Sequence, residues 1–69
     1  MNETLKNARL KAHWSIAQLA IAAGIDKRTV SNAENGTAIF DYKAQAIVDA
    51  LAKKLNQELT IQSLEIKTV

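Results

Sequence analysis

Apolar residues recur at helical spacing in four separate stretches of the first 55 residues, and polar residues or glycines divide these stretches. An apolar face that returns every 3.6 residues is typical of an amphipathic helix packed against a core. The stretches that we predict as helices are about 3–13, 16–23, 27–35 and 41–55. The pattern therefore predicts a mainly α fold, a small bundle of four to five helices.

The first predicted helix carries a charged residue on its apolar face. Leu5, Ala8, Arg9 and Ala12 share that face. A long basic side chain can lie along apolar surface and keep its charged end in water. The simplest interpretation of Arg9 is therefore a residue at the rim of the core.

The second predicted helix has the clearest boundaries. Ser15 is a good N-cap with Gln18 at the capping-box spacing, and Trp14 and Leu19 are spaced as a hydrophobic staple. Gly24 is expected to end the helix, because glycine adopts the left-handed conformation without a steric penalty.

The third predicted helix follows after a short turn. Asp26 is its expected N-cap, Ile25 and Val30 repeat the staple spacing, and Gly36 is expected to end it. Only Val30 and Ala33 suit burial, so most of this helix should face solvent. The residues expected on its exposed side are Lys27, Arg28, Thr29, Ser31 and Asn32.

The fourth predicted helix is the longest and has a regular apolar face. Before it, Ile39 and Phe40 are expected to close the base of the core. Asn56 is expected to end it in the left-handed conformation. The apolar face consists of Ala44, Ile47, Val48, Leu51 and Leu55.

Residues 58–69 change character, since they are rich in β-branched residues and alternate apolar with polar. The parity of the apolar positions changes near 62–63, which predicts a bend. A single strand cannot satisfy its own backbone groups, and Gln-Ser at the bend lacks the glycine or asparagine of a tight hairpin. We therefore expect domain 1–57 to be followed by a strand that pairs across a homodimer. The expected dimerisation residues are Leu59, Ile61, Leu64 and Ile66.

The composition limits the classes of function. A chain of 69 residues forms one small domain, whose stability is marginal unless it oligomerises. It has no cysteine and one histidine, so disulfides are excluded and neither a metal site nor another cofactor is expected. A net charge of +2 permits nucleic-acid binding without arguing strongly for it.

Targeting signals and catalytic motifs are not visible in the sequence. Without a basic-then-apolar leader or a long apolar run, a cytoplasmic location away from the membrane is expected. Without a nucleophile–base pair, a pair of acidic groups or a phosphate-binding loop, no enzymatic activity is expected.

The chemistry of the third helix distinguishes residues 15–36 from an ordinary helical hairpin. Its exposed side offers guanidinium, ammonium, hydroxyl and amide groups, which match base edges and phosphates. DNA binding is therefore favoured over a helical protein–protein interaction module, which stays as an alternative.

The same residues resemble the Cro/CI-type (XRE) helix-turn-helix family. The segments that carry the resemblance are SIAQLA at 15–20, AGID at 23–26, TVS at 29–31 and ENG at 34–36. The resemblance covers roughly residues 3–55 and is densest at 14–36. It implies a compact lambda-repressor-like bundle in which the third helix is the recognition helix.

The resemblance also implies roles for individual residues. Lys27, Arg28 and Asn32 would face base edges in the major groove, since arginine or lysine suits guanine and asparagine suits adenine. Candidates for phosphate contacts are Ser15, Thr29, Ser31, Asn35 and Thr37.

Two further positions match the family and one departs from it. Arg9 and Glu34 occupy the positions where a helix 1 arginine often pairs with a glutamate near the end of helix 3. Ile16 occupies a position that is often glutamine in phage repressors, so a phosphate contact from there is not expected. The tail is similar over a short length to the ends of HipB-like antitoxins, whose strands pair across the dimer.

The function expected from these observations is a dimeric transcriptional repressor on a two-fold symmetric operator in double-stranded DNA. One alternative is the DNA-binding antitoxin of a toxin–antitoxin pair, which would also bind a toxin protein. The other alternative is the protein–protein interaction module without DNA binding.

Overall fold

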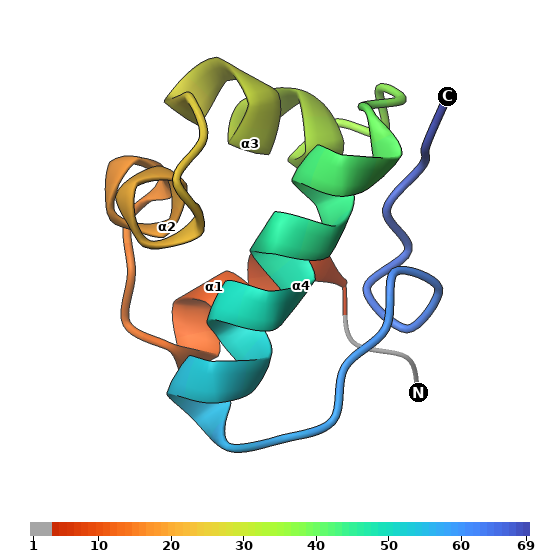
Figure 1. The fold of residues 1–69 in the computed structure, drawn as a ribbon. Coiled ribbons are helices and arrows are strands. Elements are labelled where there is room, and N and C mark those ends of the chain that lie inside the picture. Colours follow the sequence, from red (N-terminus) through yellow and green to blue (C-terminus); the bar gives the residue numbers. More distant parts are fainter. Residues whose placement is uncertain (1–3) are drawn as a thin grey trace.

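A computed structural model describes residues 4–69, which form a bundle of four helices (Figure 1). Their bounds are α1 Leu5–Lys11, α2 Ile16–Ala23, α3 Lys27–Glu34 and α4 Asp41–Leu55. The mainly helical fold and its four helices are confirmed, with ends that move by a residue or two. The start predicted at Glu3 lies outside the described residues. Thr4 caps α1, and its hydroxyl accepts a hydrogen bond from the Asn7 N–H at 3.3 Å.

The longest helix, α4, crosses the molecule, and the other elements lie around it (Figure 1). α2 contacts both α3 and α4, and α1 contacts α3 and α4. The segment after α4 returns along the side of α4 that lies away from α2 (Figure 1). α3 is therefore held from below by the bundle and lies at one edge of the molecule.

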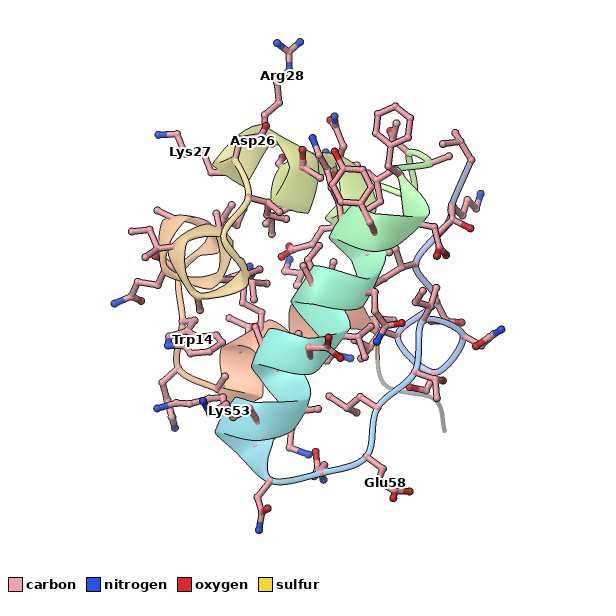
Figure 2. All side chains as sticks on the ribbon, in the orientation of Figure 1. Trp14, Asp26, Lys27, Arg28, Lys53 and Glu58 are labelled. Carbon is pink, nitrogen blue, oxygen red and sulfur yellow. The ribbon has the colours of Figure 1, made fainter. Side chains whose placement is uncertain are left out.

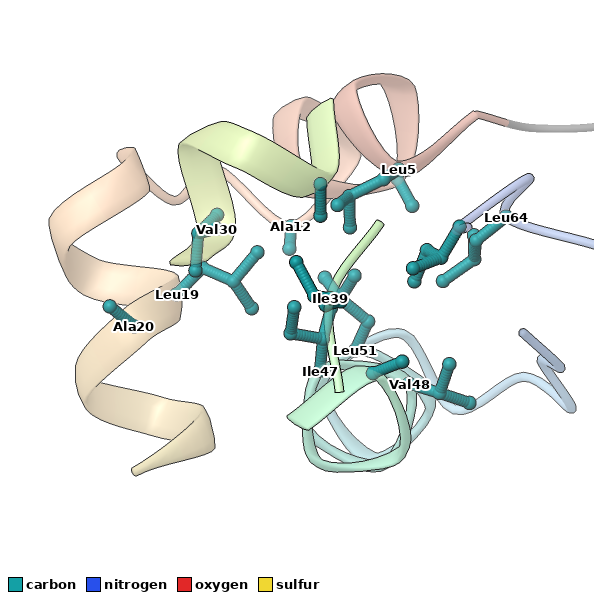
Figure 3. Packing of buried hydrophobic residues seen from close by; sticks show 14 residues of the cluster. Leu5, Ala12, Leu19, Ala20, Val30, Ile39, Ile47, Val48, Leu51 and Leu64 are labelled. Atoms are coloured by element: carbon teal, nitrogen blue, oxygen red, sulfur yellow. The ribbon is translucent and has the colours of Figure 1, made fainter. Parts of the chain in front are cut away.

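The core contains the apolar faces that the sequence pattern predicts, together with Ile39 from the connection before α4 and with Leu64 and Ile66 from the tail (Figure 3). The buried hydrophobic residues are Leu5, Ala8, Ala12, Leu19, Ala20, Val30, Ala33, Ile39, Ala44, Ile47, Val48, Leu51, Leu64 and Ile66. Phe40 was expected in the core and is not there, since 58% of it is exposed. It directly precedes α4, and its ring stacks on Tyr42 with 6.0 Å between the ring centroids. Ile39 alone closes the base of the core from this connection.

The segment after α4 corrects the prediction of a strand, because within residues 4–69 the structure has only an isolated bridge between Ile39 and Thr68. Leu64 and Ile66 are 1% and 6% exposed and fill the core of their own chain. Leu59 and Ile61 are partly buried against the same core. The four residues expected at a dimer interface therefore pack against the core of their own chain.

The tail forms backbone hydrogen bonds with the rest of its own chain. The Ile39 N–H donates to the Lys67 carbonyl at 3.0 Å, and the Leu5 N–H donates to the Leu64 carbonyl at 3.1 Å. The expected bend is a turn at 61–65. Thr60 and Ser63 stabilise its first half, because the hydroxyl of each accepts a hydrogen bond from the N–H of the other, at 2.9 and 3.0 Å. Serine and threonine hydroxyls can stabilise a turn in this way, so the bend forms without the glycine or asparagine that a tight hairpin needs.

A left-handed residue follows each of the four helices. Gly24 and Gly36 have φ of 72° and 84°, and Asn56 has φ of 53°, as predicted. His13 has φ of 60° after α1, and Glu65 has φ of 57° at the end of the turn at 61–65. At each of these ends the next N–H donates to a carbonyl five residues earlier, which satisfies a carbonyl that the helix leaves free.

Candidate nucleic-acid interface

The start of α2 is fixed by the predicted capping box. The Ser15 hydroxyl accepts a hydrogen bond from the Gln18 N–H at 3.1 Å, and the Ser15 N–H donates to the Gln18 side-chain oxygen at 2.8 Å. Both groups remain exposed. The first turn of α2 is therefore ordered and accessible, as a phosphate contact from Ser15 requires.

Residues 24–26 form the turn that sets α3 against α2. The Ile25 N–H donates to the Ala20 carbonyl at 2.9 Å, and Gly24 supplies the left-handed conformation. Asp26 caps α3, and its carboxylate accepts a hydrogen bond from the Thr29 N–H at 3.2 Å. Because Val30 is fully buried, one face of α3 is anchored in the core and the opposite face is left to solvent.

The structure corrects the expected exposure of Thr29. Only 8% of this residue is exposed, and its hydroxyl donates to the Asp26 carboxylate at 2.6 Å. The expected side-chain contact of Thr29 with a phosphate conflicts with this arrangement, because its hydroxyl proton already has a partner. Thr29 instead holds the cap of α3 in place.

The carboxyl group of Asp26 has a lowered pKa. The hydrogen bond from the Thr29 hydroxyl is the largest cause, followed by hydrogen bonds from backbone N–H groups and the charge of Lys43, while desolvation acts in the opposite direction. The Lys43 ammonium lies 3.6 Å from the Asp26 carboxylate. The N-terminal end of α3 is therefore capped by an ionised carboxylate.

Basic side chains project from the start of α3. Figure 2 shows Arg28 extending away from the bundle at the edge of the molecule, with Lys27 beside it. Both residues are exposed, whereas Ser31 and Asn32 on the following turn are half-buried. Asn32 lines a shallow hollow of about 150 Å³ between α3 and the connection to α4.

The remaining candidates for phosphate contact lie just beyond α3. Asn35 and Thr37 are exposed on either side of Gly36. The Thr37 N–H donates to the Asn32 carbonyl at 2.9 Å, so the chain leaves α3 in a fixed direction. The residues proposed for base and phosphate contacts thus lie along α3 and at its two ends, except Ser15 at the start of α2.

Arg9 and Glu34 form a bidentate ion pair that ties α1 to the end of α3. The Arg9 Nε lies 2.6 Å from one carboxylate oxygen of Glu34, and the Arg9 Nη2 donates to the other at 3.3 Å. The Arg9 Nη1 donates to the Trp14 carbonyl at 2.9 Å. The two side chains are 10% and 8% exposed, so the pair is largely removed from water.

The sequence pattern missed the neighbours of α3 on the first turn of α4. Lys43 contacts Asp26, and its ammonium lies 5.9 Å from the centre of the Phe40 ring. Phe40 and Lys43 line the same hollow as Asn32. No periodicity could have placed them there, because the contact depends on how the chain turns at residues 35–40.

Residues 4–69 contain neither a cluster of metal ligands nor a helix that could span a membrane. In the part of the chain that the structure describes, no three histidine, cysteine, aspartate or glutamate residues come together as metal ligands could. Among residues 4–69, none of the helices has the length and apolar character needed to cross a bilayer.

α2, the turn at 24–26 and α3, held on a small helical core with the start of α3 exposed, define a helix-turn-helix protein. The family model described as Helix-turn-helix matches residues 5–62, which is most of the chain. The chain therefore belongs to this family, the Cro/CI type that its sequence resembles, and is a DNA-binding helix-turn-helix protein. No curated protein and no solved structure matches it.

Proposed function

We propose that this protein is a sequence-specific transcriptional repressor that places α3 in the major groove of its operator. The observation that supports this proposal is the division of α3 into an anchored face, with Val30 buried, and an exposed start with Lys27 and Arg28. A helix fixed in this way can enter a groove without losing its contacts to the core. It would act in the cytoplasm, and no catalytic step is part of the proposal.

Some side chains of α3 would contact bases and others would contact phosphates. Arg28 and Lys27 carry donors for guanine, and the Asn32 amide can pair with adenine. Ser31, Asn35 and Thr37, together with Ser15 at the start of α2, would contact phosphates and fix the register on the duplex. Thr29 acts through Asp26, because its hydroxyl donates to that carboxylate.

A two-fold symmetric operator would require two copies of the chain. The described bundle measures 27 Å in its longest direction and carries one α3, whereas half-sites lie about 34 Å apart. The dimer is therefore proposed from operator geometry, and the tail, which packs on its own core, no longer argues for it.

Selection of bound sequences from random DNA, followed by mobility shifts on the selected duplex, tests the function directly. We expect one sequence family with two inverted half-sites about one helical turn apart, and an affinity that falls steeply with salt through counterion release. Recovery of unrelated sequences with no enrichment, or no complex at low salt, would contradict sequence-specific binding.

A further inference from the structure

A hollow away from the exposed start of α3 has no part in the proposed DNA contacts. It lies between α2 and the last two turns of α4 and has a volume of about 450 Å³. Its lining consists of Trp14, Ala22, Ala50, Lys53 and Lys54. Figure 2 shows Trp14 and Lys53 on the same side of the molecule, well separated from Arg28 and Lys27 at its edge.

The hollow has an apolar floor. Trp14 is half-buried against the core, and two alanines, Ala22 of α2 and Ala50 of α4, leave space beside its indole ring. The volume lies within the range of roughly 300–1,000 Å³ that is typical of binding pockets. One large apolar side chain can therefore enter it and lie against the indole.

The outer face of α2 extends this apolar surface. Within Ile16–Ala23 the only polar residue is Gln18, and Ile21, the residue before Ala22, is 80% exposed. A helix that is apolar on nearly all sides is normally covered by other chain. The surface is thus longer than the hollow and suits an extended partner better than a small molecule.

Two lysines give the border of the hollow a positive charge. Lys53 and Lys54 lie in the last turn of α4, and the Lys54 ammonium is 5.7 Å from the centre of the Trp14 ring. Apolar surface bordered by cations complements apolar side chains flanked by carboxylates. A second copy docked through the same surface would bring its own lysines against these two, so self-pairing here is disfavoured.

We propose that the hollow and the outer face of α2 bind an acidic amphipathic helix of a partner protein. A large apolar side chain of that helix would contact Trp14, and its carboxylates would pair with Lys53 and Lys54. The lining of the hollow shares no residue with the proposed DNA contacts, and Trp14 is the residue before Ser15. The proposal does not depend on DNA recognition by α3.

Two helical peptides of about 15 residues test the proposal, since that length is near the minimum for a stable helix. Both carry leucine and phenylalanine on one face, and the remaining positions are glutamate in one peptide and lysine in the other. Trp14 is the only tryptophan, so its fluorescence reports binding without a label. We expect the glutamate peptide to change Trp14 emission and to shift the amide resonances of Ala22, Ala50 and Lys53, at least tenfold more tightly than the lysine peptide.

A matched pair of charge reversals locates the site. Lys53→Glu should weaken the glutamate peptide about tenfold, and Lys27→Glu, which makes the same charge change on α3, should leave its affinity unchanged. Equal binding of both peptides, no binding up to millimolar peptide, or shifts confined to α3 would overturn the proposal. Tighter binding of a small aromatic carboxylate than of either peptide would also overturn it, as would self-association through Trp14 in sedimentation.

Discussion

At the scale of single residues, Arg9 shows how a charge is accommodated on a buried helix face. Three of its nitrogens have acceptors, two on Glu34 and one on the Trp14 carbonyl. Because Glu34 is the last residue of α3, the pair fixes the end of that helix against α1. A residue that the apolar pattern would place at the rim of the core therefore helps to position α3.

Breaking this pair from one side should be strongly destabilising. Replacing either Arg9 or Glu34 by methionine leaves the other charge buried without a partner, and we expect a loss of about 3–5 kcal/mol in the free energy of unfolding. Chemical denaturation of the two single variants measures the loss.

The double variant is the control for this measurement. With both charges removed, no buried charge is left unpaired, so Arg9→Met with Glu34→Met should be more stable than the less stable single variant. If the two single losses simply add in the double variant, the residues are not coupled.

The Asp26 cap should give the fold a dependence on acid pH. The pKa of its carboxyl is lowered in the folded protein, chiefly by the Thr29 hydroxyl, so the folded state binds this proton less readily than the unfolded state. Its contribution to stability is complete above the ordinary pKa, about 3.9, and is lost as the pH falls through the lowered value.

Substitution by asparagine isolates that effect, because asparagine still caps a helix but carries no charge. The stability difference between the natural protein and Asp26→Asn should be largest at pH 7 and shrink below about pH 4. Urea unfolding of both proteins across this range measures it. If the stability difference between the two proteins does not change with pH, the charge of the Asp26 carboxylate does not contribute to it.

At the scale of elements, the sequence predicts helices whose ends are determined locally. The Ser15 box, the Asp26 cap and the two glycines each act within a few residues, so their effect is visible without knowledge of the fold. The tail could not be predicted in this way. Its alternation is that of a strand, but burial of Leu64 against Leu5 and α4 determines its path, and that depends on distant parts of the chain (Figure 3).

In the candidate site too, the sequence predicts the features that are determined locally and not the contacts between distant residues. The pattern places Lys27 and Arg28 on the outer face of α3, and the structure has both exposed. The sequence pattern does not show that the Thr29 hydroxyl donates to Asp26, or that Lys43 of α4 contacts the same carboxylate. Those contacts depend on side-chain conformation and on the turn before α4, which no periodicity reports.

Glu65 offers a test of the helix-ending turns. A non-glycine residue in the left-handed conformation costs roughly 1–2 kcal/mol, and replacement by glycine removes this cost. Part of the gain is lost again, because glycine has more conformational freedom in the unfolded chain. We expect Glu65→Gly to raise the free energy of unfolding by about 0.5–1 kcal/mol in thermal or chemical denaturation. Glu65→Ala removes the same charge and keeps the Cβ atom, so it should give no such gain.

At the scale of the whole molecule, the tail is part of the core of one chain. Leu64 is 1% exposed, and its replacement by alanine should cost about 2–5 kcal/mol. Because the contact is intramolecular, the loss should be the same at every protein concentration. Unfolding measured over a hundredfold range of concentration checks this, and a loss that grows on dilution would show that the tail packs on a second chain instead.

The small size of the molecule links its stability to its proposed recognition of DNA. A domain of 69 residues has only about 0.05–0.15 kcal/mol of stability per residue. α3 is short and depends on the core, the Asp26 cap and the Arg9–Glu34 pair for its position. Changes at these supports should therefore reduce DNA affinity through folding, whereas Arg28, which is exposed, can be changed without that complication.

The most direct test is the affinity of Arg28→Ala for the selected operator at fixed salt. If Arg28 reads a base, binding should weaken by about 1–3 kcal/mol, with preference lost at one position of each half-site and the free energy of unfolding unchanged. Lys53→Ala, which removes a charge far from α3, should bind the operator as the natural protein does. Unchanged operator affinity of Arg28→Ala would contradict the assignment of α3 as the recognition helix.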